Sequence, residues 1–215
     1  MIRNEKKARH HIMFERLYSA YPRARIALDY SNPLELLVAT MLSAQCTDIT
    51  VNKVTKSLFR QYRTCEDYAA TPVEILEMDI YSTGFYRNKA RNIRAACCLM
   101  IERFAGKVPQ TMADLLTLPG VARKTANIVL SNAFGKIEGI PVDTHVKRIA
   151  KRLGLTAEDN PVKIERDLTA IIPREDWPRI SYTLIEFGRT ICKAPKPRCC
   201  ECLLKELCPS VLCRS

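Results

Sequence analysis

The amino-acid sequence predicts an all-α protein. Segments with the strict alternation of a β-strand are nearly absent, whereas residues that typically begin helices recur along the chain. The expected connections between these helices are short, as in helical bundles. With 215 residues, of which 47% are hydrophobic, the chain is long enough to bury a core in one large domain or two small ones.

The first helix is expected over residues 5–20, a basic amphipathic segment. The side chains predicted to face inward on it are Ile12, Leu17 and Tyr18. The second helix is expected to begin at Asn32 and Pro33, a capping residue followed by a proline that suits the first helical position. Residues 34–44 are apolar almost all round, which predicts a central, buried helix.

The remaining helices follow from similar signals. Thr47 and Asp48 are expected to begin the third helix, with Val51, Val54 and Leu58 at helical spacing. Residues 71–74 and 111–114 have the form of a capping box. Between them, a long helix over residues 88–104 is expected to carry Ile93, Ala96, Cys97 and Met100. Later helices are expected over residues 144–153, 161–171 and 175–191.

The charge balance points to a polyanionic partner. The formal net charge is +11 at pH 7, which favours nucleic acid over an anionic membrane surface. No apolar run approaches the ~20 residues that a membrane span requires. The first residues, 1–7, lack the apolar segment of a signal peptide, so an intracellular protein is expected, cytoplasmic or at the nucleoid if bacterial.

One stretch combines a tight turn with a chemically useful lysine. Pro119 and Gly120 suit a turn that opens directly into a helix, whose first N–H groups attract an anion. Lys124 lies in the first turn beside Arg123, and both the helix end and the arginine disfavour the ammonium form. A neutral amine can form a Schiff base, and Asp143, after a Gly/Pro-containing connection, is a candidate assistant. The alternatives are an exposed lysine and an aspartate that caps a helix.

Six of the ten cysteines lie between Cys192 and Cys213. Four of them follow the pattern C-x6-C-x2-C-x5-C, namely Cys192, Cys199, Cys202 and Cys208. Four thiolates at this spacing can converge on a zinc ion or an iron–sulfur cluster. Disulfides are the alternative, and the intracellular expectation argues against them. Cys200 and Cys213 fall outside the pattern and have no predicted role.

The run LPGVARKTAN at residues 118–127, followed by VDTH at 142–145, resembles a known signature. It is similar to the helix-hairpin-helix and Gly/Pro-Asp motif of the DNA glycosylase superfamily, specifically the endonuclease III branch. In that family the matching lysine attacks the sugar and the matching aspartate assists it. The resemblance therefore implies that Lys124 and Asp143 are the catalytic residues.

The resemblance also implies an architecture of two helical lobes with a cleft between them. One lobe would span residues 26–136 and contain the helix-hairpin-helix, and the other would combine residues 1–25 with 137–215. The hairpin at Gly120 and Ala122 is expected to contact DNA. Ala122 replaces the second glycine that is usual in the family hairpin, which puts the detailed geometry of the turn in question.

The complete cysteine spacing is similar to the 4Fe-4S loop of the endonuclease III family, so the resemblance implies a 4Fe-4S cluster at residues 192–208. The segment between the first two ligands carries three basic residues, Lys193, Lys196 and Arg198. A basic loop that a metal centre holds in place is suited to contact the DNA phosphate backbone. The alternative is a charged loop that only faces solvent.

Two further segments are candidates for entering DNA. An enzyme that acts on a base within a duplex must take the base out of the stack and fill the gap. The segment around Gln45 resembles the family segment whose glutamine inserts there, and the segment around Phe85 resembles the family's wedge loop. An aromatic side chain can stack on an orphaned base with about 1–3 kcal/mol. Core packing is the alternative for Phe85.

A further basic group follows Asp143 on one helix: Lys147, Arg148, Lys151 and Arg152. Such a group is typical of a solvated face, although phosphate contact fits its position after Asp143. His145, between Asp143 and this group, is expected to orient or cap rather than to bind a ligand.

Together these features predict a bifunctional DNA glycosylase with AP lyase activity in base excision repair. The resemblance implies oxidised or otherwise damaged pyrimidines, and abasic sites, in double-stranded DNA as substrates. The protein is expected to act as a monomer. One alternative is a monofunctional mismatch or adenine glycosylase, which lacks the nucleophilic lysine. Others are a non-catalytic helix-hairpin-helix DNA-binding protein and an electron carrier, which would explain only the cysteines.

Overall fold

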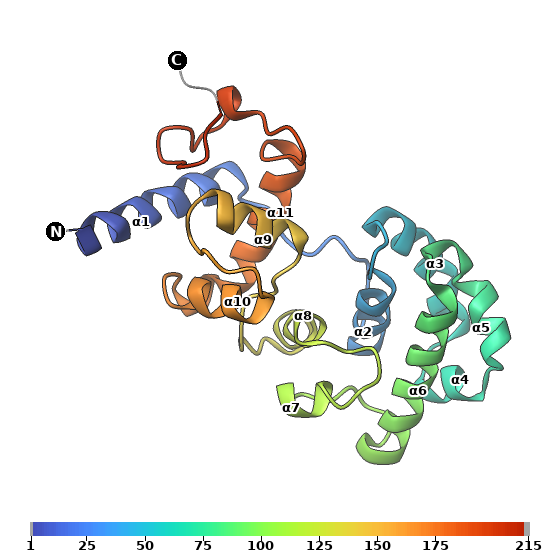
Figure 1. The fold of residues 1–215 in the computed structure, drawn as a ribbon. Helices are drawn as coiled ribbons and strands as arrows, with labels where there is room; N and C mark the ends of the chain where they lie inside the picture. Colours follow the sequence, from blue (N-terminus) through green and yellow to red (C-terminus); the bar gives the residue numbers. More distant parts are fainter. Residues whose placement is uncertain (1, 213–215) are drawn as a thin grey trace. The chain divides into compact units, whose positions relative to one another are not determined.

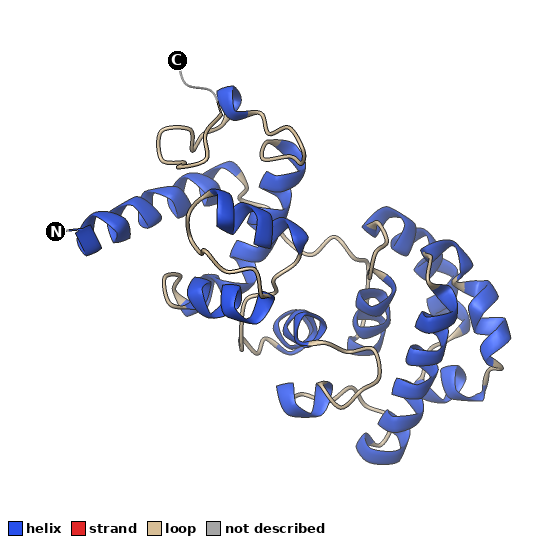
Figure 2. Ribbon diagram, in the orientation of Figure 1, coloured by secondary structure: helices blue, strands red, loops and turns tan. Residues whose placement is uncertain are grey.

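The computed structural model describes residues 2–212, and all regular structure within that range is helical (Figure 2). The prediction of an all-α protein is therefore confirmed. The chain divides into two compact units. The hairpin unit comprises Ala27–Glu138, and the cysteine unit comprises the segment up to Ile26 together with the segment from Gly139 onward.

The hairpin unit is built around α2 (Figure 1). Its elements are α2 Pro33–Leu42, α3 Asp48–Gln61, α4 Cys65–Ala70, α5 Val73–Asp79, η1 Tyr81–Thr83, α6 Tyr86–Phe104, α7 Met112–Leu115 and α8 Arg123–Phe134. Every residue from Leu36 to Leu42 is buried, and α3, α6 and α8 pack against this helix. Asn32 caps it by accepting a hydrogen bond from the Glu35 N–H, and Pro33 takes the first position, as expected.

Two of the other helix starts of this unit follow the sequence signals, and two do not. Thr47 caps α3 and Thr111 caps α7 as expected. The capping box predicted at residues 71–74 is wrong, because the Thr71 hydroxyl donates to the Asp67 carbonyl instead and α5 has no side-chain cap. A capping box that the sequence reading missed joins Thr64 and Asp67 at the start of α4.

The cysteine unit contains six helical segments in its described part, and they surround a second core. Its elements are α1 Ile2–Ala20, α9 Thr144–Arg152, α10 Pro161–Thr169, η2 Arg174–Asp176, α11 Trp177–Thr190 and η3 Cys199–Glu201. α11 lies against both α1 and α9 (Figure 1). Its side chains Leu184 and Phe187 are fully buried. Leu17 faces this core as expected.

The prediction that Ile12 faces inward is wrong, since 40% of its surface is exposed. The buried face of α1 is formed by Met13, Phe14 and Leu17. These positions are one and four residues apart, so they share one side of a helix, and Ile12 lies beside that side rather than on it.

Candidate functional site

The turn before α8 requires a glycine for two reasons. Gly120 has φ of +76°, the left-handed conformation that L-residues with a side chain rarely adopt. A Cβ atom at this position would also lie 2.9 Å from Asn92 Cβ and 3.0 Å from Met41 Cε. The turn between α7 and α8 is therefore fitted closely against α6 and α2.

Ala122 occupies the cap position of α8 in an extended conformation, with φ of −98° and ψ of 170°. Any L-residue adopts these angles, so the replacement of a glycine by alanine leaves the start of the helix undistorted. No side chain caps α8. The first N–H groups of the helix are consequently open to an external acceptor, and a phosphate oxygen suits that position.

Lys124 is the second residue of α8, and its side chain is exposed. In the described part of the chain, its amine takes part in no hydrogen bond or ion pair. The amine is therefore accessible to a substrate at the same helix end whose N–H groups suit a phosphate. Exposure is common to a surface lysine and a nucleophile, so the catalytic role of Lys124 stays a prediction.

Asp143 is half-buried and caps α9, accepting a 2.8 Å hydrogen bond from the Val146 N–H through Oδ1. This bond fixes the orientation of the carboxylate and leaves Oδ2 as an acceptor. The capping role that was one alternative for Asp143 is thus present, and it is compatible with a second role for the other oxygen. His145 lies beside Arg148, with 3.2 Å between Nδ1 and Nη2, and its orienting or capping role stays a prediction.

A pocket in the hairpin unit brings together three of the predicted DNA contacts. It encloses about 580 Å³, including space open to solvent. Its lining residues are Met41, Ala44, Gln45, Phe85, Asn88, Lys89, Asn92 and Gly120. Gln45 follows α2, Phe85 precedes α6 and Gly120 precedes α8, so three separate turns meet at one site.

Gln45 and Phe85 share an unusual backbone conformation. Their φ angles are 52° and 49°, both in the left-handed region. Both side chains are exposed, and Phe85 retains 66% of its surface. Core packing, the alternative for Phe85, is therefore wrong. Non-glycine residues held in this conformation are enriched at functional sites.

The pocket is also lined by three residues for which the sequence predicted no role: Asn88, Lys89 and Asn92. Asn88 and Asn92 lie four residues apart on α6, so their amides share a face of the helix, and this spacing was visible in the sequence. The burial of Lys89, at 6% exposure, had no such signal, since a lysine near a helix start is usually solvated.

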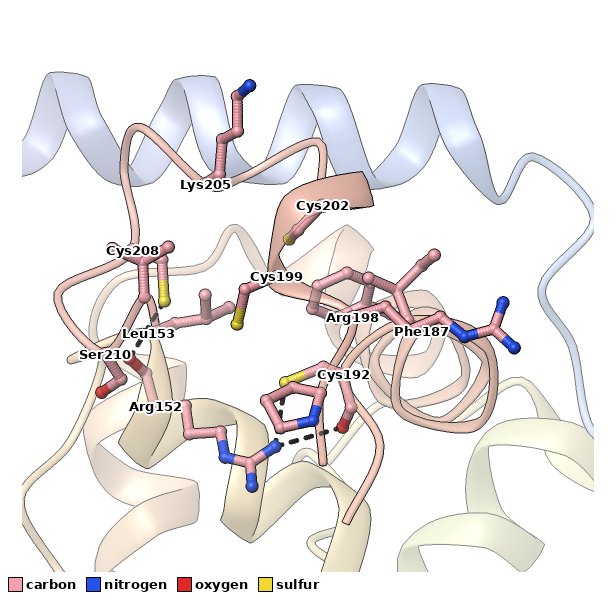
Figure 3. Close-up of a pocket in the computed structure, with 13 residues that line it drawn as sticks. Arg152, Leu153, Phe187, Cys192, Arg198, Cys199, Cys202, Lys205, Cys208 and Ser210 are labelled. Carbon is pink, nitrogen blue, oxygen red and sulfur yellow. Dashed lines mark hydrogen bonds between the residues drawn. The ribbon is translucent and has the colours of Figure 1, made fainter. Parts of the chain in front are cut away.

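The four cysteines of the predicted pattern line one pocket in the cysteine unit, and their thiols point toward the same space (Figure 3). Within residues 2–212, no three Cys, His, Asp or Glu side chains approach closely enough to hold a single metal ion. Thiols that face one pocket suit a single centre held by all four cysteines, either a zinc ion or an iron–sulfur cluster.

The chemistry of this donor set suits a cationic centre. Burial is the main cause that raises the pKa of the Cys202 and Cys208 thiols, and the other cysteines of the pocket raise both further. Four thiolates facing one another are therefore unfavourable by themselves. A metal centre among them supplies the opposite charge and reverses this effect.

Arginine side chains hold the cysteine loop, which we define as residues 191–212. Arg152 Nη1 donates to Cys192 Sγ at 3.4 Å (Figure 3). It also donates to the Lys193 carbonyl at 2.8 Å, and Arg148 Nη2 donates to the Cys192 carbonyl at 3.1 Å. From α1, Arg9 Nε donates to the Leu207 carbonyl at 2.9 Å.

The two lysines of the basic group on α9 are also engaged. Lys147 and Lys151 form ion pairs with Asp159 at 3.1 and 2.9 Å. With Arg148 and Arg152 directed to the cysteine loop, this group serves mainly to hold the unit together rather than to present free charge. In the loop itself, Lys196 is exposed, Lys193 is half-buried, and Arg198 lies 3.7 Å from the Glu201 carboxylate.

The fold agrees with comparisons to known proteins. Residues 38–174 match the HhH-GPD superfamily of base excision DNA repair proteins, and the chain belongs to this superfamily. Within it, the chain belongs to the endonuclease III family. It is 55% identical to endonuclease III of Synechocystis over 90% of this chain and 89% of the relative, and 50% identical to that of Bacillus subtilis over the same shares.

Solved structures give the same result. A non-covalent complex of endonuclease III with DNA is 48% identical, with a TM-score of 0.91 over 95% of each chain. A trapped covalent endonuclease III–DNA intermediate is 48% identical, with a TM-score of 0.90 over 94% of this chain and 96% of that chain. Among residues 2–212, no helix has both the length and the apolar character needed to cross a membrane.

Proposed function

We propose that this chain is a bifunctional DNA glycosylase and AP lyase of base excision repair. Its proposed substrates are oxidised or otherwise damaged pyrimidines and abasic sites in double-stranded DNA, on which it acts as a monomer. The observation that carries the proposal is Lys124, an exposed and unpaired amine in the first turn of a helix that follows a glycine-dependent hairpin and has no side-chain cap. Membership of the endonuclease III family supports it.

The hairpin unit offers two kinds of contact to DNA. The open N–H groups at the start of α8, after Gly120 and Ala122, suit a phosphate oxygen. Gln45 and Phe85, exposed at one pocket, suit the gap that an extruded nucleotide leaves. The glutamine amide can hydrogen-bond to base edges, and the aromatic ring can stack on the orphaned base.

In the proposed reaction, the neutral amine of Lys124 attacks C1′ of the damaged nucleotide. The glycosidic C1′–N bond breaks, and its electron pair leaves with the base, which takes up a proton. The attached nitrogen loses one proton, and opening of the sugar ring places a proton on O4′ and leaves a protonated Schiff base, an iminium, at C1′. The iminium acidifies the C2′ hydrogen, and its removal breaks the C3′–O bond, whose electron pair leaves with the 3′ phosphate. Water then hydrolyses the Schiff base and frees the lysine. The role proposed for Asp143 is to stabilise positive charge and take protons through the oxygen that does not cap α9.

We also propose that Cys192, Cys199, Cys202 and Cys208 hold a 4Fe-4S cluster. Its thiolate ligands come from one short loop, so the cluster would cross-link that loop, and base excision itself transfers no electrons. The loop then presents Lys193, Lys196 and Arg198 to the phosphate backbone. Lys196 is ready for such a contact, whereas Arg198 first has to leave Glu201.

A monofunctional glycosylase is the second candidate, and the presence of Lys124 argues against it. Borohydride reduction separates the two, because it converts a Schiff base into a stable covalent adduct. The wild-type protein is expected to form such an adduct with duplex DNA containing an abasic site. Lys124→Arg is expected to lose the adduct while it still binds this DNA, since a guanidinium keeps the positive charge but is not a nucleophile.

The control is Lys136→Arg, on the same hairpin unit. Lys136 is exposed and its amine donates only to the Gln110 carbonyl, so this variant is expected to form the adduct at the wild-type rate. Absence of an adduct with wild-type protein would remove the lyase assignment. An undiminished adduct in Lys124→Arg would remove Lys124 as the nucleophile.

A further inference from the structure

Lys89 is the buried cation of the hairpin unit that the proposed reaction does not use. It lies in the first turn of α6 and is 6% exposed. Burial lowers the pKa of its amine, so the protein loses stability by keeping this charge away from water. A buried ammonium therefore needs strong partners, and their identity indicates what the residue does.

The partners of Lys89 are two backbone carbonyls from different segments. Nζ donates to the Leu42 oxygen and to the Thr83 oxygen, both at 2.8 Å. Leu42 is the last residue of α2 and Thr83 is the last residue of η1. Carbonyls at helix ends lack partners within the helix and carry partial negative charge, so both are good acceptors for a cation.

Each of these carbonyls stands at the start of a turn that carries an exposed residue at the pocket. The turn after Leu42 leads to Gln45, and the turn after Thr83 leads to Phe85. Gln45 and Phe85 are two of the three non-glycine residues with positive φ in the described chain. The left-handed conformation costs about 1–2 kcal/mol per residue, so surrounding contacts have to hold it.

From this geometry we propose that Lys89 is a positioning residue for DNA insertion. One amine holds together the residues at which the two turns begin, and thereby fixes the separation and direction of Gln45 and Phe85. The inference rests on the proposed function and deepens it, because it concerns entry into the duplex rather than the reaction at C1′. A tetrahedral ammonium suits this task since it offers donors in several directions from one point.

The proposal predicts a difference between two substrates. An abasic site in single-stranded DNA requires no unstacking and no filled gap, whereas a damaged base in a duplex requires both. Lys89→Met keeps the length of the side chain and removes both hydrogen bonds. We expect it to slow single-turnover excision from a duplex by about tenfold or more, the scale of a misplaced group. Borohydride trapping on single-stranded abasic DNA should change less than about twofold, because Lys124 is not altered.

A spectroscopic measurement tests the same point without turnover. A duplex carries a stable abasic analogue opposite the fluorescent base 2-aminopurine, whose emission depends on its stacking. Wild-type protein should change this emission as Gln45 and Phe85 enter the stack, and Lys89→Met should show a smaller change at saturating protein. Lys107→Met is the matched control, because Lys107 is an exposed lysine just beyond the far end of α6.

The outcomes separate the possible failures. If Lys89→Met slows the duplex and single-strand reactions equally, or slows neither, the positioning role is wrong. If wild-type protein forms no adduct with abasic DNA, duplex or single-stranded, the lyase proposal fails instead. If Lys89→Met does not fold, Lys89→Gln keeps two N–H donors on a shorter side chain, and its duplex rate should lie well below wild type with trapping retained.

Discussion

Two irregular parts of the molecule are held by basic side chains: the pocket turns of the hairpin unit, which are the turns after Leu42 and after Thr83, and the cysteine loop of the cysteine unit. In both, buried or half-buried basic side chains donate hydrogen bonds to backbone carbonyls within the segment or at the helix end that precedes it. In the pocket turns, a single lysine, Lys89, reaches two helix ends. In the cysteine loop, arginines from α1 and α9 reach several carbonyls, with Arg152 also in contact with a cysteine sulfur.

The two regions differ in where their functional side chains point. Gln45 and Phe85 point outward from turns that follow or precede helices packed on the buried α2. The cysteine thiols instead point inward to a shared pocket (Figure 3). Lys89 thus supports the pocket turns from within the protein, whereas support at the centre of the cysteine loop would come from the cluster that we propose its thiols to hold. Three predictions test this difference.

The largest expected effect is that of removing a proposed cluster ligand. In Cys199→Ser, the cysteine loop should lose its central cross-link, and its amide hydrogen-exchange protection should fall roughly 100-fold, or about 3 kcal/mol. Residues 42–48 and 83–89 should keep their protection, because Lys89 holds them independently. Hydrogen exchange followed by mass spectrometry resolves these segments. Equal loss of protection in both regions would show that the pocket turns also depend on the metal centre.

This contrast also explains what the sequence could predict. The starts of α2 and α3 were predictable because Asn32, Pro33 and Thr47 act on N–H groups within a few residues of themselves. The cysteine pattern was predictable for the same reason, since its members lie in one short loop. Such local signals do not need knowledge of the fold.

Long-range pairings left no such signal. Lys89 is buried because carbonyls from Leu42 and Thr83 meet on it, and the sequence places Leu42 far from the other two. Thr71 was also mispredicted, although its partner is close in sequence. Its hydroxyl donates to the Asp67 carbonyl and therefore does not cap α5. In α1, the helix was predicted correctly, but one buried position was assigned to Ile12 and lies instead at the next residue, Met13. The catalytic roles of Lys124 and Asp143 came from resemblance, and burial and hydrogen bonding do not decide them.

The second prediction concerns how closely the pocket is packed. Gly120→Ala adds a Cβ atom at φ of +76° and 2.9 Å from Asn92 Cβ, so it combines backbone strain with a clash. The free energy of unfolding should fall by about 2–4 kcal/mol, from about 1 kcal/mol of strain plus the overpacking cost. Urea unfolding measures this loss, and affinity for abasic duplex should weaken with it.

Gly135→Ala provides the matched control. Gly135 has φ of +64° at the end of α8, and no atom lies within 4 Å of a Cβ added there. This variant should therefore lose only the strain energy, about 1 kcal/mol, and retain DNA affinity. Equal losses of stability in the two variants would mean that the pocket adjusts to the extra methyl group and is not closely packed.

The smallest expected effect tests whether the stability of the hairpin unit is independent of the cysteine loop. Asp67 accepts hydrogen bonds from the Arg63 and Thr64 N–H groups, and these bonds lower the pKa of its carboxyl below the ordinary value. A lowered folded-state pKa contributes stability that is present at neutral pH and is lost as the pH falls through that pKa. Asp67→Asn should therefore cost about 1 kcal/mol in urea unfolding at pH 7 and progressively less below pH ~4. The visible absorbance of a bound cluster should stay unchanged in this variant at pH 7, because Asp67 belongs to the hairpin unit. A loss of absorbance in this variant would show that the stability of the cysteine loop depends on that of the hairpin unit.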